Sequence, residues 1–387
     1  MTDIPRRGKQ VAEPDYHWVD SPEGLEAAIP RFLGYPCVAM DTEADSLYRY
    51  EERICLIQIS CPGGDWLIDA LALPTLGPLR RLLEEQSVEK VFHGADYDIR
   101  LLKKAGIQPK AVFDTMVAAQ ILGIRRVGLS DLLRERFGIE LVKRFQKADW
   151  GRRPLPPDMV RYALEDTRHL LRLREALLAE LEAKGRLGWA RRQFDALLEV
   201  RPAPRTPPDA LRVPGARNLD DRGRAILQSL LDWREEVARK RDLPPFKVVG
   251  TEVLLKLAMR AGASSLDFGG IPGLTEKVIR TSGQGIREAI QRGYLAHPIP
   301  WSPRKRPQAE RAPMGGRRRL ALLKAVRDRK ARDLGLDPGV LCPNAALKTL
   351  AVSSPREFEE RLEQSLSPWQ RELLAAELRG AILGGCR

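Results

Sequence analysis

Short strand-forming segments occupy the first half of this 387-residue sequence and disappear from the second half. They are rich in β-branched residues, and turn-forming residues such as Asp-Ser and Pro-Gly-Gly separate them. Helical patterns alternate with the later segments. The segments are CVAMD (37–41), RICLIQIS (53–60), DWLIDA (65–70), VEKVFHG (88–94) and AVFDT (111–115). Strands in succession, then alternating with helices, predict a mixed α/β sheet flanked by helices, whose second strand forms an antiparallel hairpin with the first.

The end of this expected α/β domain is helical. Apolar residues recur at helical spacing from Pro157 to about Arg186, and a proline suits the first turn of a helix. We expect one long amphipathic helix there that closes the domain.

Two proline-rich stretches divide the rest of the chain. The first, RPAPRTPPDALRVPG, holds five prolines, which exclude regular helix and stiffen an extended connection. The second, HPIPWSPRKRPQAERAPMGGRRR, is also strongly basic, and both are followed by amphipathic helical patterns without strands. We therefore expect an α/β domain at 1–200, a linker at 201–216, an all-helical domain at 217–296, a basic linker at 297–316 and a second, degenerate helical domain at 317–387.

The two helical domains carry a weak internal repeat. Trp233-Arg234 precedes a Leu-Pro-Pro at 243–245, and Val326-Arg327 precedes a Leu-Asp-Pro at 336–338. Chance resemblance between two helical bundles is the alternative explanation.

The composition indicates which binding partners and which cellular compartment to expect. A formal net charge of +13 favours a polyanionic partner, although a basic protein without one is the alternative. Five scattered cysteines indicate neither a disulfide framework nor a zinc site. The N-terminus lacks the apolar core of a signal peptide and no long apolar run occurs, so we expect a cytoplasmic protein without a membrane segment.

Acidic residues stand at three places that could carry chemistry, the first being a strand end. Asp41 and Glu43 lie two positions apart, so strand alternation puts both on one side. Such close carboxylates repel each other unless a cation or solvent compensates them. A metal-binding pair and a solvated strand end are both open on this motif alone.

The second place is the strand-to-helix turn HGADYD. Aspartate is favoured in a first helical turn by capping and by the helix dipole, which is the structural alternative to a metal ligand. Apolar residues that follow Asp98 seat its helix against the sheet, so Asp98 is the metal candidate and Asp96 the expected cap.

The third place is YALED, where Tyr162 and Asp166 are four residues apart on one helical face. Four carboxylates and a tyrosine on strand ends and helices are the groups that phosphodiester hydrolysis with two metal ions requires.

The motifs DTEA, FHGADYD and YALED, in this order, resemble the exonuclease motifs of the DEDD superfamily, in the subgroup with tyrosine in its third motif. Ribonuclease D is the family most similar. CLIQIS, VFDTMVAAQIL, GLSDLL and KRFQKADWGRRPLPPDMVRYALEDTRHLL extend the likeness over residues 17–190. The resemblance implies a ribonuclease H-like fold for the first domain.

The resemblance also implies roles. Asp41, Glu43, Asp98 and Asp166 would ligate two divalent ions, Mg²⁺ or Mn²⁺, and Tyr162 would orient the attacking water. The expected activity is 3′→5′ exoribonuclease action that releases 5′-mononucleotides from transfer RNA precursors and other structured RNA. A DNA-directed 3′→5′ exonuclease and a catalytically silent RNA-binding protein are the alternatives.

Other residues near the motifs are assigned as follows. We interpret His93 as structural or as a flank of the site, and we assign His169 no role. Asp114 is expected to cap the next helix, with support of the site as the alternative. Residues Trp150, Arg152 and Arg153 resemble a family segment in which a nucleic-acid contact is plausible.

The helical half resembles the helicase and ribonuclease D C-terminal (HRDC) fold, a bundle that usually binds nucleic acid. The family carries two such modules, which matches the two helical domains. A basic run could track phosphates in a salt-dependent way, or could serve as a solubilising linker. It comprises Arg304, Lys305, Arg306, Arg311, Arg317, Arg318 and Arg319. The sequence indicates no obligate protein partner.

Overall fold

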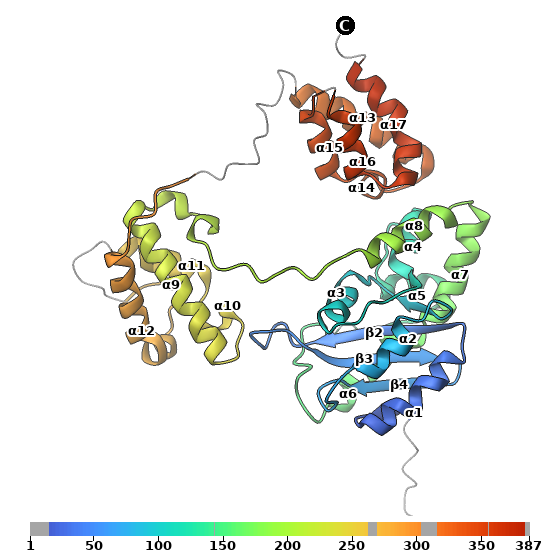
Figure 1. Ribbon diagram of the computed structural model, residues 1–387, viewed down its shortest axis with the longest axis horizontal. Coiled ribbons are helices and arrows are strands. Elements are labelled where there is room, and N and C mark those ends of the chain that lie inside the picture. The colour runs from blue at the N-terminus through green and yellow to red at the C-terminus, as the bar shows by residue number, and fades with distance from the viewer. Residues whose placement is uncertain (1–14, 143, 262–268, 303–315, 355, 384–387) are drawn as a thin grey trace, which may run out of the picture. The chain divides into compact units, whose positions relative to one another are not determined.

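The computed structural model in Figure 1 describes residues 15–142, 144–261, 269–302, 316–354 and 356–383. By their contacts the residues form two compact units. The first comprises Met1–Glu43, Ile54–Pro202 and Ala312–Arg387, and the second comprises Ala44–Arg53 and Ala203–Arg311. In the described part of the chain, no helix is both long and apolar enough to cross a membrane.

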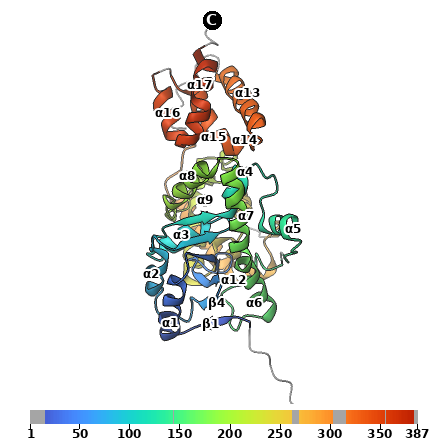
Figure 2. The same cartoon turned by 90° about the vertical axis from the view of Figure 1, so that its right-hand side faces the viewer.

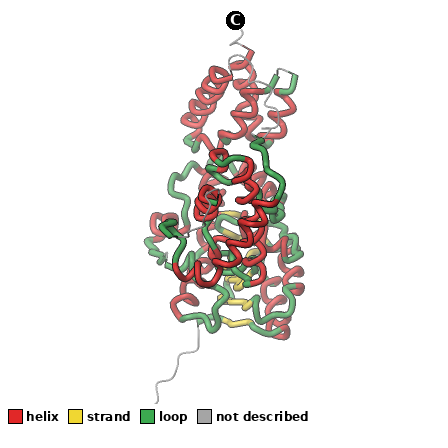
Figure 3. The backbone as a smooth tube through the Cα atoms, turned by 90° about the vertical axis from the view of Figure 1, so that its left-hand side faces the viewer, coloured by secondary structure: helices red, strands yellow, loops and turns green. Residues whose placement is uncertain are grey.

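All described strands belong to one mixed sheet, drawn yellow in Figure 3. Its order is β1-β4-β3-β2-β5-β6. Strand pairs β1/β4, β2/β5 and β5/β6 are parallel, β3/β4 is antiparallel, and β2 and β3 point in opposite directions in Figure 1. The bounds are β1 His17–Val19, β2 Cys37–Ala44, β3 Ile54–Cys61, β4 Gly64–Asp69, β5 Glu89–Phe92 and β6 Val112–Asp114. The mixed sheet and its first hairpin are as predicted, whereas β1 was not expected.

Helices cover both faces of this sheet, which is why every residue of β3 is buried. Figure 2 shows α1 and α2 on one side and α6 and α7 on the other. Phe32 of α1 packs edge-on against Trp66, while Asp65 beside it faces Arg168 of α6. The helices are α1 Pro22–Leu33, α2 Arg80–Leu83, α3 Asp96–Lys104, α4 Thr115–Leu122, α5 Leu129–Phe137, α6 Pro157–Arg168, α7 Leu170–Ala183 and α8 Leu187–Leu198.

The prediction of one long helix from Pro157 to Arg186 is wrong, because the chain turns at His169. Helix α6 ends at Arg168 and α7 begins at Leu170. The His169 ring lies 3.1 Å from a carboxylate oxygen of Glu165 at the end of α6. The break lets α6 pack on β3 and β4 while α7 packs on α4 and β5, which one straight helix could not do.

The second unit contains helices, the segment 44–53 and irregular connections. Its helices are α9 Asp221–Lys240, α10 Pro245–Val248, α11 Thr251–Arg260 and α12 Glu276–Leu295. Helices α9 and α12 approach closely at Gly293, where an added Cβ would lie 2.5 Å from the Cα of Ile226. Tyr50 packs on this core, and its hydroxyl donates a 2.6 Å hydrogen bond to Glu235.

The first unit contains a second helical module at its C-terminal end. Its helices are α13 Gly316–Leu334, α14 Pro338–Leu341, α15 Asn344–Val352, α16 Phe358–Ser365 and α17 Pro368–Leu383. Its core is continuous with that of α4, α7 and α8. Trp189 of α8 stacks on Trp369 of α17 with ring centroids 5.2 Å apart. The domain boundaries at 201–216 and 297–316 stay predictions.

Each helical module has a buried arginine at the equivalent position, and this correspondence supports the internal repeat. Arg234 donates to the carbonyl oxygen of Val249 at 3.1 Å and to the hydroxyl of Thr251 at 2.9 Å. Arg327 donates to the carbonyl oxygen of Cys342 at 3.1 Å and to Asn344 Oδ1 at 2.8 Å. The acceptors follow the arginine at the same two spacings in both modules.

Candidate metal-binding active site

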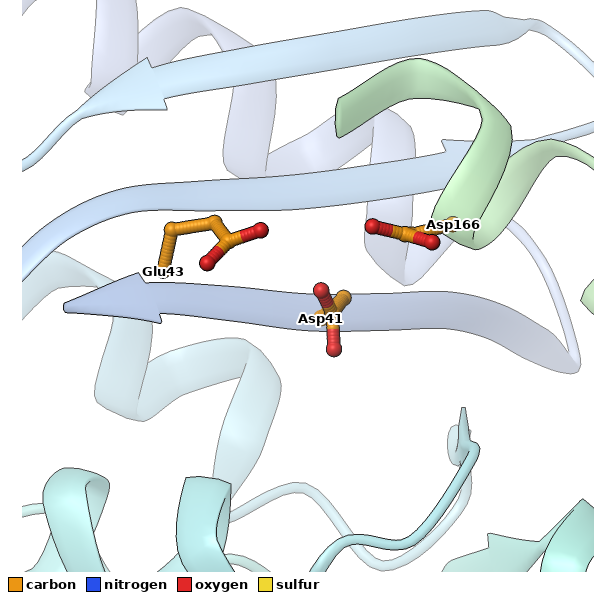
Figure 4. A group of neighbouring side chains, drawn as sticks. All are labelled: Asp41, Glu43 and Asp166. Carbon is orange, nitrogen blue, oxygen red and sulfur yellow. The ribbon is translucent and has the colours of Figure 1, made fainter. Parts of the chain in front are cut away.

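The carboxylates of Asp41, Glu43 and Asp166 form a cluster between strand β2 and helix α6 (Figure 4). One oxygen from each lies within 4.8 Å of one oxygen from each of the others. Strand alternation directs Asp41 and Glu43 to the same face of β2. Asp166 stands on the last turn of α6, which is held against β3 by a 2.7 Å hydrogen bond between the hydroxyls of Thr167 and Ser60. The structure therefore brings together residues that are more than 120 positions apart.

Burial and mutual repulsion set the electrostatics of this cluster. Desolvation is the largest cause that raises the pKa of Asp41, and the neighbouring carboxylates add to it. Burial also raises the pKa of Glu43 to about 9 and that of Asp166 to about 7. Oxygen-only carboxylate ligands suit hard divalent cations, which would relieve this repulsion. The residues present fit a divalent metal site.

Asp98 is held beside the cluster through Thr42, the residue between Asp41 and Glu43. Its Oδ1 accepts hydrogen bonds from the Thr42 backbone N–H at 3.1 Å and from the Thr42 hydroxyl at 2.6 Å. Burial raises the pKa of Asp98 to about 6, and the Thr42 hydroxyl works against that rise. Asp98 thus lies outside the group of three defined above but is tied directly to the strand that carries two of its members.

Tyr162 stands one helical turn before Asp166, and its hydroxyl is hydrogen-bonded to that carboxylate. Its ring packs against Phe145 and Trp150, with centroids 5.9 Å and 6.0 Å away. Burial, followed by repulsion from the three carboxylates of the cluster, raises the pKa of the Tyr162 phenol far above its usual range. The raised pKa favours a protonated phenol at neutral pH, which can donate a hydrogen bond to Asp166 or to another partner.

Asp114 organises the turn that leads to Asp98. Its carboxylate caps α4 through the N–H groups of Met116 and Val117. The same carboxylate accepts from the N–H groups of Gly94 and Ala95, at 3.1 Å and 2.8 Å. Capping, the expected role, is confirmed, and one side chain also holds the second motif.

The comparisons with known proteins agree with this geometry. The 3′–5′ exonuclease family matches residues 16–182, and the HRDC domain matches residues 223–290 and 317–382. Ribonuclease D of Pseudomonas paraeruginosa is 30% identical over 96% of this chain and 99% of its own. The chain belongs to the ribonuclease D family of 3′→5′ exoribonucleases.

Solved structures of related proteins have a similar fold. The crystal structure of Escherichia coli RNase D, described as an exoribonuclease involved in structured RNA processing, aligns with a TM-score of 0.69 at 25% identity. It covers 95% of this chain and 99% of that one. A mutant of the catalytic core of RRP6 from Trypanosoma brucei aligns with a TM-score of 0.62 at 26% identity, covering 73% of this chain and 80% of that one. The two HRDC matches also confirm the internal repeat.

Asp96 and His93 flank Asp98 in the second motif. The prediction that Asp96 caps α3 is wrong: Ala95 occupies the N-cap position and no side chain caps it. Asp96 instead forms an ion pair with Arg100 one turn later, at 2.7 Å. His93 is structural, since its Nδ1 lies 2.9 Å from the Thr115 hydroxyl within hydrogen-bond distance.

The residues expected to contact nucleic acid differ in how exposed they are. Trp150 is only 1% exposed, and its ring packs against that of Tyr162. Arg153 is engaged in an ion pair with Asp69 at 2.6 Å and in a hydrogen bond to the Cys55 carbonyl oxygen at 2.7 Å. Arg152 is exposed. Residues Arg304, Lys305, Arg306 and Arg311 lie outside the described residues.

Thr42 is the functional residue that sequence reasoning missed. Its hydroxyl and its backbone N–H both bind Asp98, so it links the first and second motifs. The available signal was a hydroxyl residue between two acidic ones, but it gives no hint of a partner 56 positions away.

Proposed function

We propose that this family member hydrolyses RNA from the 3′ end with two divalent ions, Mg²⁺ or Mn²⁺, and releases 5′-mononucleotides. The observation that carries the proposal is the convergence of Asp41, Glu43 and Asp166, with Asp98 and Tyr162 beside them. We infer that the four carboxylates are the metal ligands. Transfer RNA precursors and other structured RNA are the proposed substrates.

The chemistry can be divided between the ions and the protein. Bound divalent ions would supply an acidified water and charge neutralisation at the scissile phosphate. Asp41 and Glu43, on one rigid strand, would hold their positions relative to Asp166 on α6. Thr42 and Asp114 would position Asp98, because their hydrogen bonds restrain its side chain and the turn before it. Tyr162, protonated and hydrogen-bonded to Asp166, would orient the attacking water.

Two further observations support an RNA substrate. The formal net charge of +13 favours a polyanion, and relatives that cover nearly the whole chain are named as ribonucleases. Sugar preference has no clear residue signature, because contacts to a 2′-hydroxyl can come from backbone groups. The cytoplasmic location expected from the sequence stays a prediction.

The decisive experiment compares two aspartates of the same protein. Matched RNA and DNA oligonucleotides with a labelled 3′ end are incubated with the wild type, Asp41→Asn and Asp96→Asn, with and without Mg²⁺ or Mn²⁺. Asp96 is the matched control because it is exposed and pairs with Arg100. We expect metal-dependent release of 5′-mononucleotides from RNA and little change in Asp96→Asn. Asp41→Asn should lose about 100-fold, the upper end of the range for groups that merely support metal ligands.

Other outcomes would point elsewhere. Faster release from DNA than from RNA would make this a DNA-directed exonuclease. RNA binding without release under either metal would indicate a silent nuclease fold and would contradict the proposal.

A further inference from the structure

The second unit carries a pocket of about 380 Å³ beside an exposed tryptophan. The Trp301 side chain is 40% exposed although it is a large aromatic group. We call this site the Trp301 pocket. It is lined by Leu211, Arg212, Val213, Pro214, Gly215, Arg217 and Trp301.

The start of α9 holds the segment that leads to Trp301. The Ile299 N–H donates to the Asp221 carbonyl oxygen at 2.9 Å, and Arg224 Nε donates to the Ile299 carbonyl oxygen at 2.8 Å. Arg224 is only 3% exposed, and its guanidinium lies 5.8 Å from the centre of the Trp301 ring. Two hydrogen bonds thus anchor the backbone two residues before Trp301, which reduces the freedom that this segment loses when a ligand binds.

Two arginines, Arg212 and Arg217, line the pocket together with Trp301. Arg217 is exposed and forms no ion pair with any acidic residue in the described ranges. Arg212 pairs with Asp209 at 3.2 Å, but its side chain is still 51% exposed. The pocket therefore offers an aromatic face, apolar walls and two guanidinium groups that solvent reaches.

This combination matches the chemistry of an unpaired nucleotide. Aromatic side chains bind single-stranded nucleic acid by stacking on the base, and arginines bind phosphate through charge-assisted hydrogen bonds. The volume is within the range of about 300–1,000 Å³ usual for small-ligand pockets. A base inside a duplex has both faces covered by its neighbours, so the pocket would select unpaired RNA.

We propose that the Trp301 pocket binds one unpaired nucleotide of single-stranded RNA, with the base on the Trp301 indole and its phosphate on Arg217 and Arg212. The choice of RNA rests on the proposed function. This binding site would hold substrate outside the acidic cluster and would be indifferent to base sequence.

The test measures RNA affinity of the full chain by fluorescence anisotropy without metal, so that no hydrolysis occurs. The probes are a labelled unpaired 12-nucleotide RNA and a blunt duplex of the same sequence. The variants are Trp301→Ala, Trp301→Phe, Arg217→Ala and, as matched control, Arg280→Ala. Arg280 is exposed in the same module, about 20 Å along α12 from the helix end that leads to Trp301.

We expect Trp301→Ala to weaken binding of unpaired RNA roughly 5- to 100-fold, the range found for loss of one stacked base. Trp301→Phe should keep most of the affinity, and duplex binding should change little in either variant. Arg217→Ala should lower the slope of log affinity against log salt by about 0.7, as expected for one phosphate contact. Arg280→Ala should leave both quantities unchanged.

Wild-type affinity in Trp301→Ala, or equal weakening for Arg217→Ala and Arg280→Ala, would overturn the proposal. If Trp301→Ala fails to fold, as judged by its circular dichroism melting curve, the surface variant Arg217→Ala decides. Nucleotide release by the wild type in Mg²⁺ is measured in parallel. Nucleotide release by the wild type, with unaltered RNA binding in the variants, would contradict the Trp301 pocket proposal alone. RNA binding that depends on Trp301, without nucleotide release, would contradict the proposed function alone.

Discussion

The carboxyl groups at the site lie close to other negative charges and are at least partly buried. They belong to Asp98, which is buried, and to Asp41, Glu43 and Asp166, which are half-buried. Their pKa values are raised with burial as the largest cause. A carboxyl with a higher pKa in the folded than in the unfolded chain takes up protons on folding, so the free energy of unfolding falls as pH rises between the two values. From an unfolded value of about 4, that interval extends to about 6 for Asp98, about 7 for Asp166 and about 9 for Glu43.

The first prediction concerns pH and metal together. Asp98 and Asp166 are mostly charged at pH 7.5 but largely protonated at pH 5, so a cation competes with fewer protons at the higher pH. Added Mg²⁺ or Mn²⁺ should therefore raise the melting temperature more at pH 7.5 than at pH 5. Differential scanning fluorimetry with and without metal at both pH values measures the difference. Asp41→Asn should lose most of the metal effect and Asp96→Asn should keep it. An equal metal effect at the two pH values would contradict this account.

The buried arginines give a second prediction at the same scale. Arg234→Ala and Arg327→Ala each leave a buried carbonyl oxygen and a polar side chain without their donor. We expect each change to lower the free energy of unfolding by about 1–3 kcal/mol. Urea denaturation measures it, with the exposed Arg280→Ala as control, expected within about 0.5 kcal/mol of wild type. If all three variants match in stability, the shared arginine has no structural role.

At the scale of elements, helix starts and ends depend on which side chains reach the free backbone groups. The helical period is the same in α6 and α7, so the sequence pattern could not reveal the break at His169. The second motif likewise held two candidate aspartates in one helical turn. The apolar residues after Asp98 made it the metal candidate, and that role stays a prediction. The cap was assigned wrongly, because Asp96 has a partner in Arg100.

The start of α4 gives a third prediction. Asp114→Ala removes the N-cap of α4 and the acceptor for the turn at Gly94 and Ala95. A lost cap costs about 1 kcal/mol, and the unpaired N–H groups should add about 1–3 kcal/mol. Because that turn carries Asp98, kcat for nucleotide release should fall as well. Asp131→Ala, which changes a half-buried first-turn aspartate of α5 paired with Arg134, is the control for urea denaturation and turnover. Loss of stability with unchanged kcat would show that Asp114 acts on the fold only.

At the scale of the whole molecule, the second HRDC module shares a hydrophobic core with the nuclease helices. Gly123, at the end of α4, lies so close to the module that an added Cβ would be 1.9 Å from the Gly335 carbonyl oxygen. Arg186 strengthens the same contact by donating to the carbonyl oxygens of Ile121 and Leu334.

The fourth prediction separates this contact from backbone strain. Gly123→Ala meets both a φ of +84° and a clash with backbone, whereas Gly106→Ala meets a φ of +81° with nothing within 4 Å. The left-handed conformation costs about 1–2 kcal/mol for a non-glycine residue, so both variants should be destabilised. Gly123→Ala should lose more, as measured by the free energy of unfolding in urea. Equal losses would mean that the second module does not pack against α4.

The sequence by itself determined the local features of this protein. Alternation in strands, helical periodicity and prolines are properties of neighbouring residues, so the mixed sheet, the helical second half and the acidic motifs could be predicted from it. The resemblance of the motifs then identified the family before any geometry was known.

Only the tertiary structure decided which distant groups meet. The cluster of Asp41, Glu43 and Asp166, the Thr42 link to Asp98 and the burial of Trp150 depend on how α3 and α6 pack against the sheet. The hydrophobic core shared by the nuclease helices and the second HRDC module likewise depends on tertiary packing. Such contacts join residues far apart in the chain, and their burial, which sets pKa and accessibility, is a property of all the elements packed around them.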